Sequence, residues 1–164
     1  MVDIWRGYRL QSRGWQKDPP AKVHPSILFG SGEALTPAFV KKHDITHVIN
    51  CAFPEDSPAW FFDEHPFNYF CVGAVDSLTD DIRGWMGIFE YMMNKYLADS
   101  ESKVVYVHCQ CGINRSGFLT LMYICKRFGY NFDTSVKAIL TQRPCALTNP
   151  VYMKQSREYI KNLS

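Results

Sequence analysis

Short apolar runs rich in β-branched residues alternate with longer amphipathic segments along most of this chain. Such runs, bounded by turn residues, are typical of short buried strands. They predict strands at residues 26–30, 45–51, 67–72 and 104–107.

The segments between and after these runs predict helices. Residues 82–96 and 131–140 repeat apolar side chains at intervals of three and four, and 118–128 is almost wholly apolar and ends before Gly129. Thr79 is the expected N-cap of the first of these, and Asn149 precedes a proline at the first position of a last helix. A short helix is expected at 35–42, and 53–66, with three prolines, is predicted to be a loop.

Strands interleaved with helices, followed by helices alone, indicate an α/β fold with a central, mostly parallel twisted sheet flanked by helices. We expect one domain over residues 23–164, preceded by an extension over 1–22. Ligands of such sheets bind beyond the carboxyl ends of the strands, where His108 and Cys109 follow the 104–107 run.

Composition adds little to this picture except in the extension. The net charge is +2 over 164 residues, but residues 1–22 hold five basic and two acidic residues. Trp5, Tyr8 and Trp15 alternate with these arginines. Three interpretations stay open: a segment lying on the surface, a contact with RNA or an acidic partner, and a homodimer contact through residues 1–22.

Six cysteines occur without a secretory signal, so we expect reduced thiols and an intracellular protein, cytoplasmic or nuclear. No run of eighteen apolar residues is present, which predicts no membrane association.

The strongest chemical pattern is His108-Cys109, five residues, then Arg115-Ser116-Gly117, placed between a strand and a helix. Consecutive backbone N–H groups in such a loop form an anion-binding concavity, and the helix N-terminus adds partial positive charge. This environment, with Arg115, lowers the pKa of a cysteine thiol below its usual value of about 8.5. We therefore expect Cys109 to be a nucleophile beneath a bound phosphate.

The neighbouring residues suit the same chemistry. Arg115 can hold two phosphate oxygens, and Ser116 can stabilise the thiolate as a leaving group. His108 is expected to brace the loop by hydrogen bonds. The rest of the expected phosphate-binding loop is uncharged and comprises Gln110, Cys111, Gly112, Ile113 and Asn114.

A metal site is not expected here. His108, Cys109 and Cys111 are neighbours on one tight loop, an arrangement that rarely fills a tetrahedral shell, and no fourth ligand is evident in the sequence. The Gly-Lys-Ser/Thr of nucleotide-binding phosphate loops is absent from the chain.

The 108–117 motif resembles that of the cysteine-dependent protein tyrosine phosphatase superfamily, and the wider chain is similar to its dual-specificity class. Supporting segments are 27–35, 45–51, Arg143-Pro144 and Asn149-Pro150. The resemblance implies a two-step reaction through a phosphocysteine, without metal or cofactor. It also implies an aspartate acid and base, and Asp76, thirty-three residues before Cys109, is the expected residue. Asp80 and Asp81 are better explained by the start of a helix.

The expected substrates are proteins phosphorylated on tyrosine, serine or threonine. The uncharged loop argues against inositol lipids, since phosphoinositide phosphatases of this superfamily place lysines there. The run Gly112-Ile-Asn-Arg115 is also similar to the loop of RNA 5′-triphosphatases of the same fold, which leaves RNA as an alternative. A phosphopeptide-binding pseudophosphatase is the other alternative, although such proteins usually lose the cysteine, the arginine or the acid.

Related phosphatases also keep a cysteine that can trap the nucleophile as a disulfide. Cys51, at the end of a strand expected to neighbour the 104–107 strand, is the candidate redox partner of Cys109. Cys111 is the rival, but a span of two residues on a curled loop makes awkward disulfide geometry.

Overall fold

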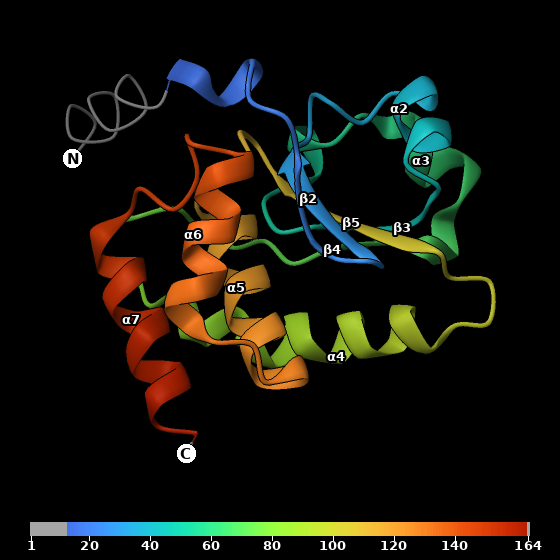
Figure 1. Cartoon of the computed structure of the whole chain (residues 1–164). Helices are drawn as coiled ribbons and strands as arrows, with labels where there is room; N and C mark the ends of the chain where they lie inside the picture. The colour runs from blue at the N-terminus through green and yellow to red at the C-terminus, as the bar shows by residue number, and fades with distance from the viewer. Residues whose placement is uncertain (1–12, 164) are drawn as a thin grey trace.

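The structure, a computed structural model, describes residues 13–163, and a five-stranded sheet lies at its centre (Figure 1). The strand order is β1-β2-β5-β3-β4, with β1 antiparallel to β2 and the other pairs parallel. The bounds are Ala21–His24 (β1), Ile27–Ser31 (β2), Ile45–Asn50 (β3), Tyr69–Cys71 (β4) and Val104–Cys109 (β5). The predicted α/β fold with a mostly parallel sheet is confirmed.

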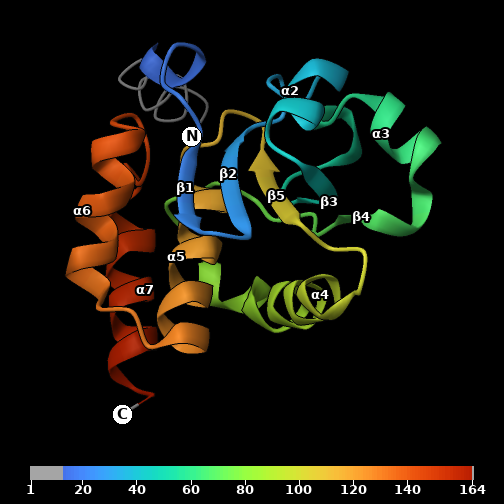
Figure 2. The same ribbon diagram turned by 45° about the vertical axis from the view of Figure 1, so that its right-hand side comes forward.

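Helices cover both faces of this sheet (Figures 1 and 2). Four long helices lie on one face: Met86–Ala98 (α4), Arg115–Phe128 (α5), Phe132–Gln142 (α6) and Pro150–Lys161 (α7). The short helices Pro37–Lys42 (α2) and Ala59–Glu64 (α3) cover the other. Because successive strand residues point to opposite faces, Val105 and Val107 of β5 join the core under the long helices, and Tyr106 joins the other core.

The helix ends follow from local sequence. Asn131 caps α6 by accepting a hydrogen bond from the Thr134 N–H at 2.9 Å, and Asn149 caps α7. Gly129 ends α5 in the left-handed region at φ 69°. Helix α5 begins at Arg115, three residues earlier than its apolar run indicates, and α2 begins at Pro37 after the cap Thr36.

The prediction of a loop over residues 53–66 is wrong. This segment contains the 3₁₀ turn Pro54–Asp56 and helix α3. Pro54 lies in the first turn and Pro58 at the N-cap, where a missing N–H costs no hydrogen bond. Prolines that look like helix breakers in sequence therefore begin the helical segments here.

The predicted cap at Thr79 is also wrong. The helical segment begins with a 3₁₀ turn, Ile82–Trp85, and Asp81 is its N-cap, accepting from the Arg83 N–H at 3.0 Å. Thr79 lies before this, in a turn held by the Ser77 hydroxyl, which accepts from the Thr79 N–H at 3.1 Å. Asp80 lies in the same turn and not in the first turn of the helix.

The predicted boundary between residues 22 and 23 falls inside β1, which pairs with β2 in the sheet. A 3₁₀ turn at Arg13–Gln16 precedes it. Residues 1–12 lie outside the described residues, and dimerisation through residues 1–22 stays a prediction. No helix within 13–163 combines the length and apolarity needed to cross a bilayer.

Candidate active site

The carboxyl ends of β2, β3 and β5 meet at one edge of the sheet. Ser31 of β2 is paired with Cys109 of β5, and Asn50 of β3 with His108. From this edge the chain passes through residues 109–115, called here the 109–115 loop, into α5. The loop turns at Gly112, at φ 67°, where a Cβ atom would lie 2.2 Å from the Gly30 carbonyl carbon. The glycine is required by this close approach.

Cys109 lies at the base of the loop and is only 2% exposed. Its Sγ is 3.2 Å from the Ser116 hydroxyl. Burial alone would raise the pKa of the Cys109 thiol. Attraction to Arg115 and hydrogen bonds from Ser116 and from the Ile113 N–H outweigh burial, and the pKa is lowered. The surroundings therefore stabilise the thiolate of Cys109, relative to that of an ordinary cysteine, at the position that the motif predicts for a nucleophile.

Arg115 is 7% exposed and opens helix α5. One of its terminal nitrogens, Nη1, donates to the Ala74 carbonyl at 3.1 Å. Its Nε has no hydrogen-bond partner among the described residues. A buried unpaired donor costs free energy, and an anion bound over Cys109 would offer this donor an acceptor.

Asp76 is held at the rim of the site by two amide side chains. Its Oδ2 accepts from Asn114 Nδ2 at 3.1 Å, and its Oδ1 accepts from Asn149 Nδ2 at 3.2 Å. Tyr152 fixes the same segment, because its hydroxyl donates to the Val75 carbonyl and accepts from the Ser77 N–H. The Asp76 carboxylate is thereby tied to the 109–115 loop through Asn114.

Three of these supporting residues were missed in the sequence. Asn149 is identified there as a helix cap and within the Asn149-Pro150 segment, with no contact to the site assigned to it, yet its oxygen caps α7 while its nitrogen holds Asp76. Tyr152 is identified only as part of an apolar helix face, and Ala74 carries no sequence signal, because its backbone carbonyl makes the contact. The Asn-Pro spacing alone could not show a contact 73 residues away.

His108 is fully buried, and both of its ring nitrogens have a hydrogen-bond partner. One ring nitrogen lies 2.9 Å from the Cys109 carbonyl oxygen and the other 3.1 Å from the Ser57 hydroxyl. Burial lowers its pKa to about 4. The imidazole is therefore neutral, and because both of its ring nitrogens are engaged in hydrogen bonds, neither is available to carry a proton during a reaction.

The buried neutral state of His108 predicts a pH-dependent stability. The unfolded chain binds a proton at His108 near pH 6.5, and the folded chain does so only near pH 4, so folding opposes protonation between these values. We expect the free energy of unfolding to fall by up to about 3 kcal/mol from this residue as the pH drops through that window. Urea denaturation at several pH values, compared with His108→Gln, measures it. Equal pH slopes in the two proteins would contradict the assignment.

The other loop residues divide by burial. Asn114 and Ile113 are buried, and their oxygens accept from the N–H groups of Asn149 and Leu147, both at 2.9 Å. Gln110 and Cys111 are half-buried. The loop presents no charged side chain other than Arg115.

Cys51 is fully buried beside this site. It follows Asn50 on β3 as Cys109 follows His108 on the paired strand β5, and its N–H donates to the His108 carbonyl at 2.6 Å. Burial, followed by the proximity of Cys109, raises the pKa of the Cys51 thiol well above its usual value. The predicted adjacency of the two strands is confirmed.

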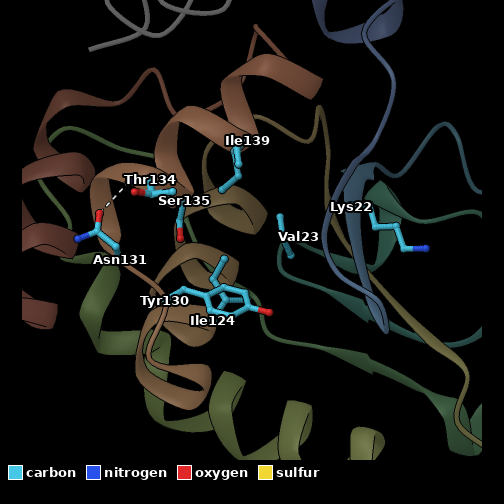
Figure 3. A pocket seen from close by; sticks show the side chains of 9 residues that line it. Lys22, Val23, Ile124, Tyr130, Asn131, Thr134, Ser135 and Ile139 are labelled. Carbon is cyan, nitrogen blue, oxygen red and sulfur yellow. Dashed lines mark hydrogen bonds between the residues drawn. The ribbon is translucent and has the colours of Figure 1, made fainter.

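Two further hollows lie outside the cradle over Cys109. A cavity of about 250 Å³ lies between β1, α5 and α6 (Figure 3), but no cysteine, histidine or carboxylate lines it. A hollow of about 430 Å³ adjoins the 109–115 loop at Gln110 and is lined also by Trp15, Gly32, Glu33, Glu55, Asp56, Ser57 and Pro58. Within residues 13–163 no three histidine, cysteine or carboxylate side chains group as metal ligands.

Comparison with known proteins agrees with this geometry. The family model described as the dual specificity phosphatase catalytic domain matches residues 27–162. The chain is similar to dual specificity protein phosphatase 19 of Mus musculus, with 27% identity over 84% of this chain, and to protein phosphatase Slingshot of Drosophila melanogaster, with 26% identity over 88%. It spans 60% of the mouse protein and 13% of the fly protein.

Among solved structures the fold is shared with human DUSP28. The TM-score is 0.73 at 20% sequence identity, and the match covers 88% of this chain and 95% of the human one.

Proposed function

This chain belongs to the dual-specificity phosphatases, and we propose that it is an active, metal-free enzyme that dephosphorylates proteins on tyrosine and on serine or threonine. The observation that carries the proposal is the set of contacts around one sulfur atom. Cys109 has a lowered pKa, its sulfur contacts the Ser116 hydroxyl, and Arg115 beside it keeps an unpaired donor. The relatives of the chain are named as protein phosphatases.

In the first step, the Cys109 thiolate attacks phosphorus and the bond from phosphorus to the ester oxygen breaks. Arg115 pairs with the phosphoryl oxygens, where negative charge must be held in the transition state. Asp76, in its protonated form, gives its proton to the departing oxygen. The products are a phosphocysteine, a free hydroxyl on the substrate and the Asp76 carboxylate.

In the second step, the Asp76 carboxylate takes a proton from water as the water oxygen attacks phosphorus. The sulfur–phosphorus bond breaks and inorganic phosphate leaves. The Ser116 hydroxyl, 3.2 Å from the sulfur, stabilises the thiolate that departs. The two steps return Cys109 and Asp76 to their starting protonation states.

The surroundings of the loop favour a protein substrate over RNA. The hollow beside Gln110 carries the carboxylates of Glu33, Glu55 and Asp56, which repel a polyanionic chain. It also carries Trp15, which gives an apolar surface for a peptide. The loop itself lacks the lysines that would hold the additional phosphates of an inositol lipid.

A side-by-side assay tests the proposal. Matched peptides carrying phosphotyrosine or phosphothreonine and an RNA with a 5′-triphosphate are presented at equal concentration, and released phosphate is measured. We expect turnover of the peptides and little of the RNA. Preferential release from RNA would support the triphosphatase alternative. Peptide binding without turnover of any substrate would support a pseudophosphatase.

We also propose that Cys51 protects Cys109 during oxidation. Peroxide converts the Cys109 thiolate to a sulfenic acid and is reduced to hydroxide. The Cys51 thiol then attacks that sulfur, a disulfide forms, and water leaves. The strand pairing that puts Cys51 next to Cys109 supports the disulfide, and the lowered pKa of Cys109 beside the raised pKa of Cys51 supports oxidation of Cys109 first.

Peptide mapping after mild peroxide treatment is expected to yield a peptide joined through Cys51 and Cys109. Thiol reduction should then restore phosphatase activity to the wild type and much less to Cys51→Ala, in which Cys109 proceeds to irreversible acids. Cys111→Ser is the matched control and should recover like the wild type. A disulfide from Cys109 to Cys111 would reject the role of Cys51.

The proposed setting is intracellular, cytoplasmic or nuclear, since this chemistry requires a reduced thiol. None of the six cysteines, all of which lie within residues 13–163, is joined in a disulfide.

A further inference from the structure

Arg143 lies just after α6 and is 2% exposed, one of the largest fully buried side chains in residues 13–163. No carboxylate among the described residues forms an ion pair with it. Within residues 13–163, its side-chain hydrogen bonds go to backbone carbonyls. A buried guanidinium is costly unless its donors are paired, so these carbonyl groups determine where it sits.

Two of the carbonyls belong to the 109–115 loop. Arg143 Nε donates to the Gly112 oxygen and Nη2 donates to the Cys111 oxygen, both at 2.7 Å. The C=O and N–H of one peptide unit point in opposite directions. Holding the Gly112 oxygen outward therefore aims the Ile113 N–H inward, and this N–H is one of the groups that lower the pKa of Cys109.

The other carbonyls belong to the segment before the predicted domain. Nη2 also donates to the Trp15 oxygen at 2.9 Å, and Nη1 donates to the oxygens of Asp18 and Pro19 at 2.7 and 3.2 Å. The Asp18 carboxylate adds a separate tie by accepting from the Cys145 N–H at 2.8 Å. In Figures 1 and 2 this segment, in dark blue, lies near the end of α6.

We infer that Arg143 is a positioning residue for the 109–115 loop, and that residues 15–19 form the other half of its support. The inference rests on the proposed function, because it concerns how the loop binds phosphate. The planar guanidinium of Arg143 is hydrogen-bonded both to the loop and to the segment. Loss of the segment's carbonyls would leave some of its buried N–H donors without acceptors. Because the group is planar and rigid, a shift that satisfies those donors would also break its hydrogen bonds to the loop's carbonyls. The same contacts place Trp15 in the hollow beside Gln110.

The first test is Arg143→Lys in the full chain. Lysine keeps the positive charge but lacks the planar guanidinium whose N–H groups reach several carbonyls at once. Tungstate, a phosphate mimic, is used as the probe. We expect its affinity to fall about 10-fold to 100-fold, the loss associated with one or two charge-assisted hydrogen bonds. The pKa of Cys109, followed by thiolate absorbance against a Cys109→Ser blank, should rise.

Ile139→Val is the matched control for general destabilisation. Ile139 is buried in α6, and its apolar side chain can form no hydrogen bond to the loop. It should lower thermal stability while leaving tungstate affinity and the thiolate pKa near their wild-type values. If Arg143→Lys behaves like this control, Arg143 is only structural and the inference is wrong.

The role of residues 15–19 is tested by Asp18→Ala, alone and combined with Arg143→Lys. Asp18→Ala removes the tie to Cys145 and leaves every backbone carbonyl that accepts from Arg143 in place. We expect a several-fold loss of tungstate affinity from it in the wild-type background and a much smaller loss in Arg143→Lys. Equal losses in the two backgrounds would show that the segment does not act through Arg143.

These measurements need no turnover, so they separate the inference from the proposed function. A protein that dephosphorylates peptides but binds tungstate equally with and without Arg143 overturns the inference alone. A protein that shows the predicted shifts but hydrolyses nothing overturns the proposed activity and leaves the positioning role supported.

Discussion

Replacement of Cys109 by serine is expected to reduce phosphate release by at least about 10⁴-fold, the scale of losing a nucleophile that acts with its partners as a unit. A serine hydroxyl stays protonated at neutral pH in the position where Arg115, Ser116 and the Ile113 N–H favour a thiolate. The measurement is turnover of an aryl phosphate and of a phosphotyrosine peptide, with peptide affinity determined separately by calorimetry. Affinity should change little, because the loop amides and Arg115 remain.

The matched control for Cys109→Ser is Cys71→Ser on β4, outside the 109–115 loop. Cys71 is half-buried, and its thiol donates to the Ala52 carbonyl, a hydrogen bond that a serine hydroxyl can also make. We expect its turnover to stay within about threefold of the wild type, the range of an ordinary surface substitution. If both variants lost activity equally, or neither did, the nucleophile would have to be sought at another position.

Much of the fold and the centre of the site could be predicted from the sequence. The 104–107 strand, the 109–115 loop and helix α5 are consecutive, so one short stretch determines where Cys109, Arg115 and Ser116 lie relative to one another. Local cues such as Asn131 and Gly129 also gave correct helix ends. Features that depend on residues close together in the sequence can be predicted, because the backbone itself fixes the separation of those residues.

The contacts that hold the loop from outside could not be predicted in the same way. Arg143 reaches carbonyl oxygens 31 and 128 residues away, and a carbonyl is present at every residue, so the sequence gives no sign of which ones are used. The helical character of 53–66 was missed for another reason. Its prolines were interpreted without their position, although a proline in a first turn favours a helix and a proline in its middle breaks one.

Asp76→Asn is expected to lower kcat for a phosphothreonine peptide by about 10²-fold to 10⁴-fold, the usual contribution of general acid catalysis. An amide cannot deliver a proton to the leaving oxygen. It is also poorly matched to its neighbours, since Asn114 and Asn149 both donate to the Asp76 carboxylate. Measurement of kcat and KM separately should place most of the loss in kcat.

The leaving group distinguishes this role from a structural one. An aryl phosphate with an acidic phenol departs without much help from a proton donor, whereas the alcohol of phosphothreonine needs one. The loss in Asp76→Asn should therefore be much smaller for the activated aryl ester than for the threonine ester. Asp80→Asn, four residues away in the turn held by Ser77, should lower neither rate by more than about threefold. If Asp76→Asn lost equal activity on both esters, the carboxylate would be acting on loop position through Asn114, and the proton donor would lie elsewhere.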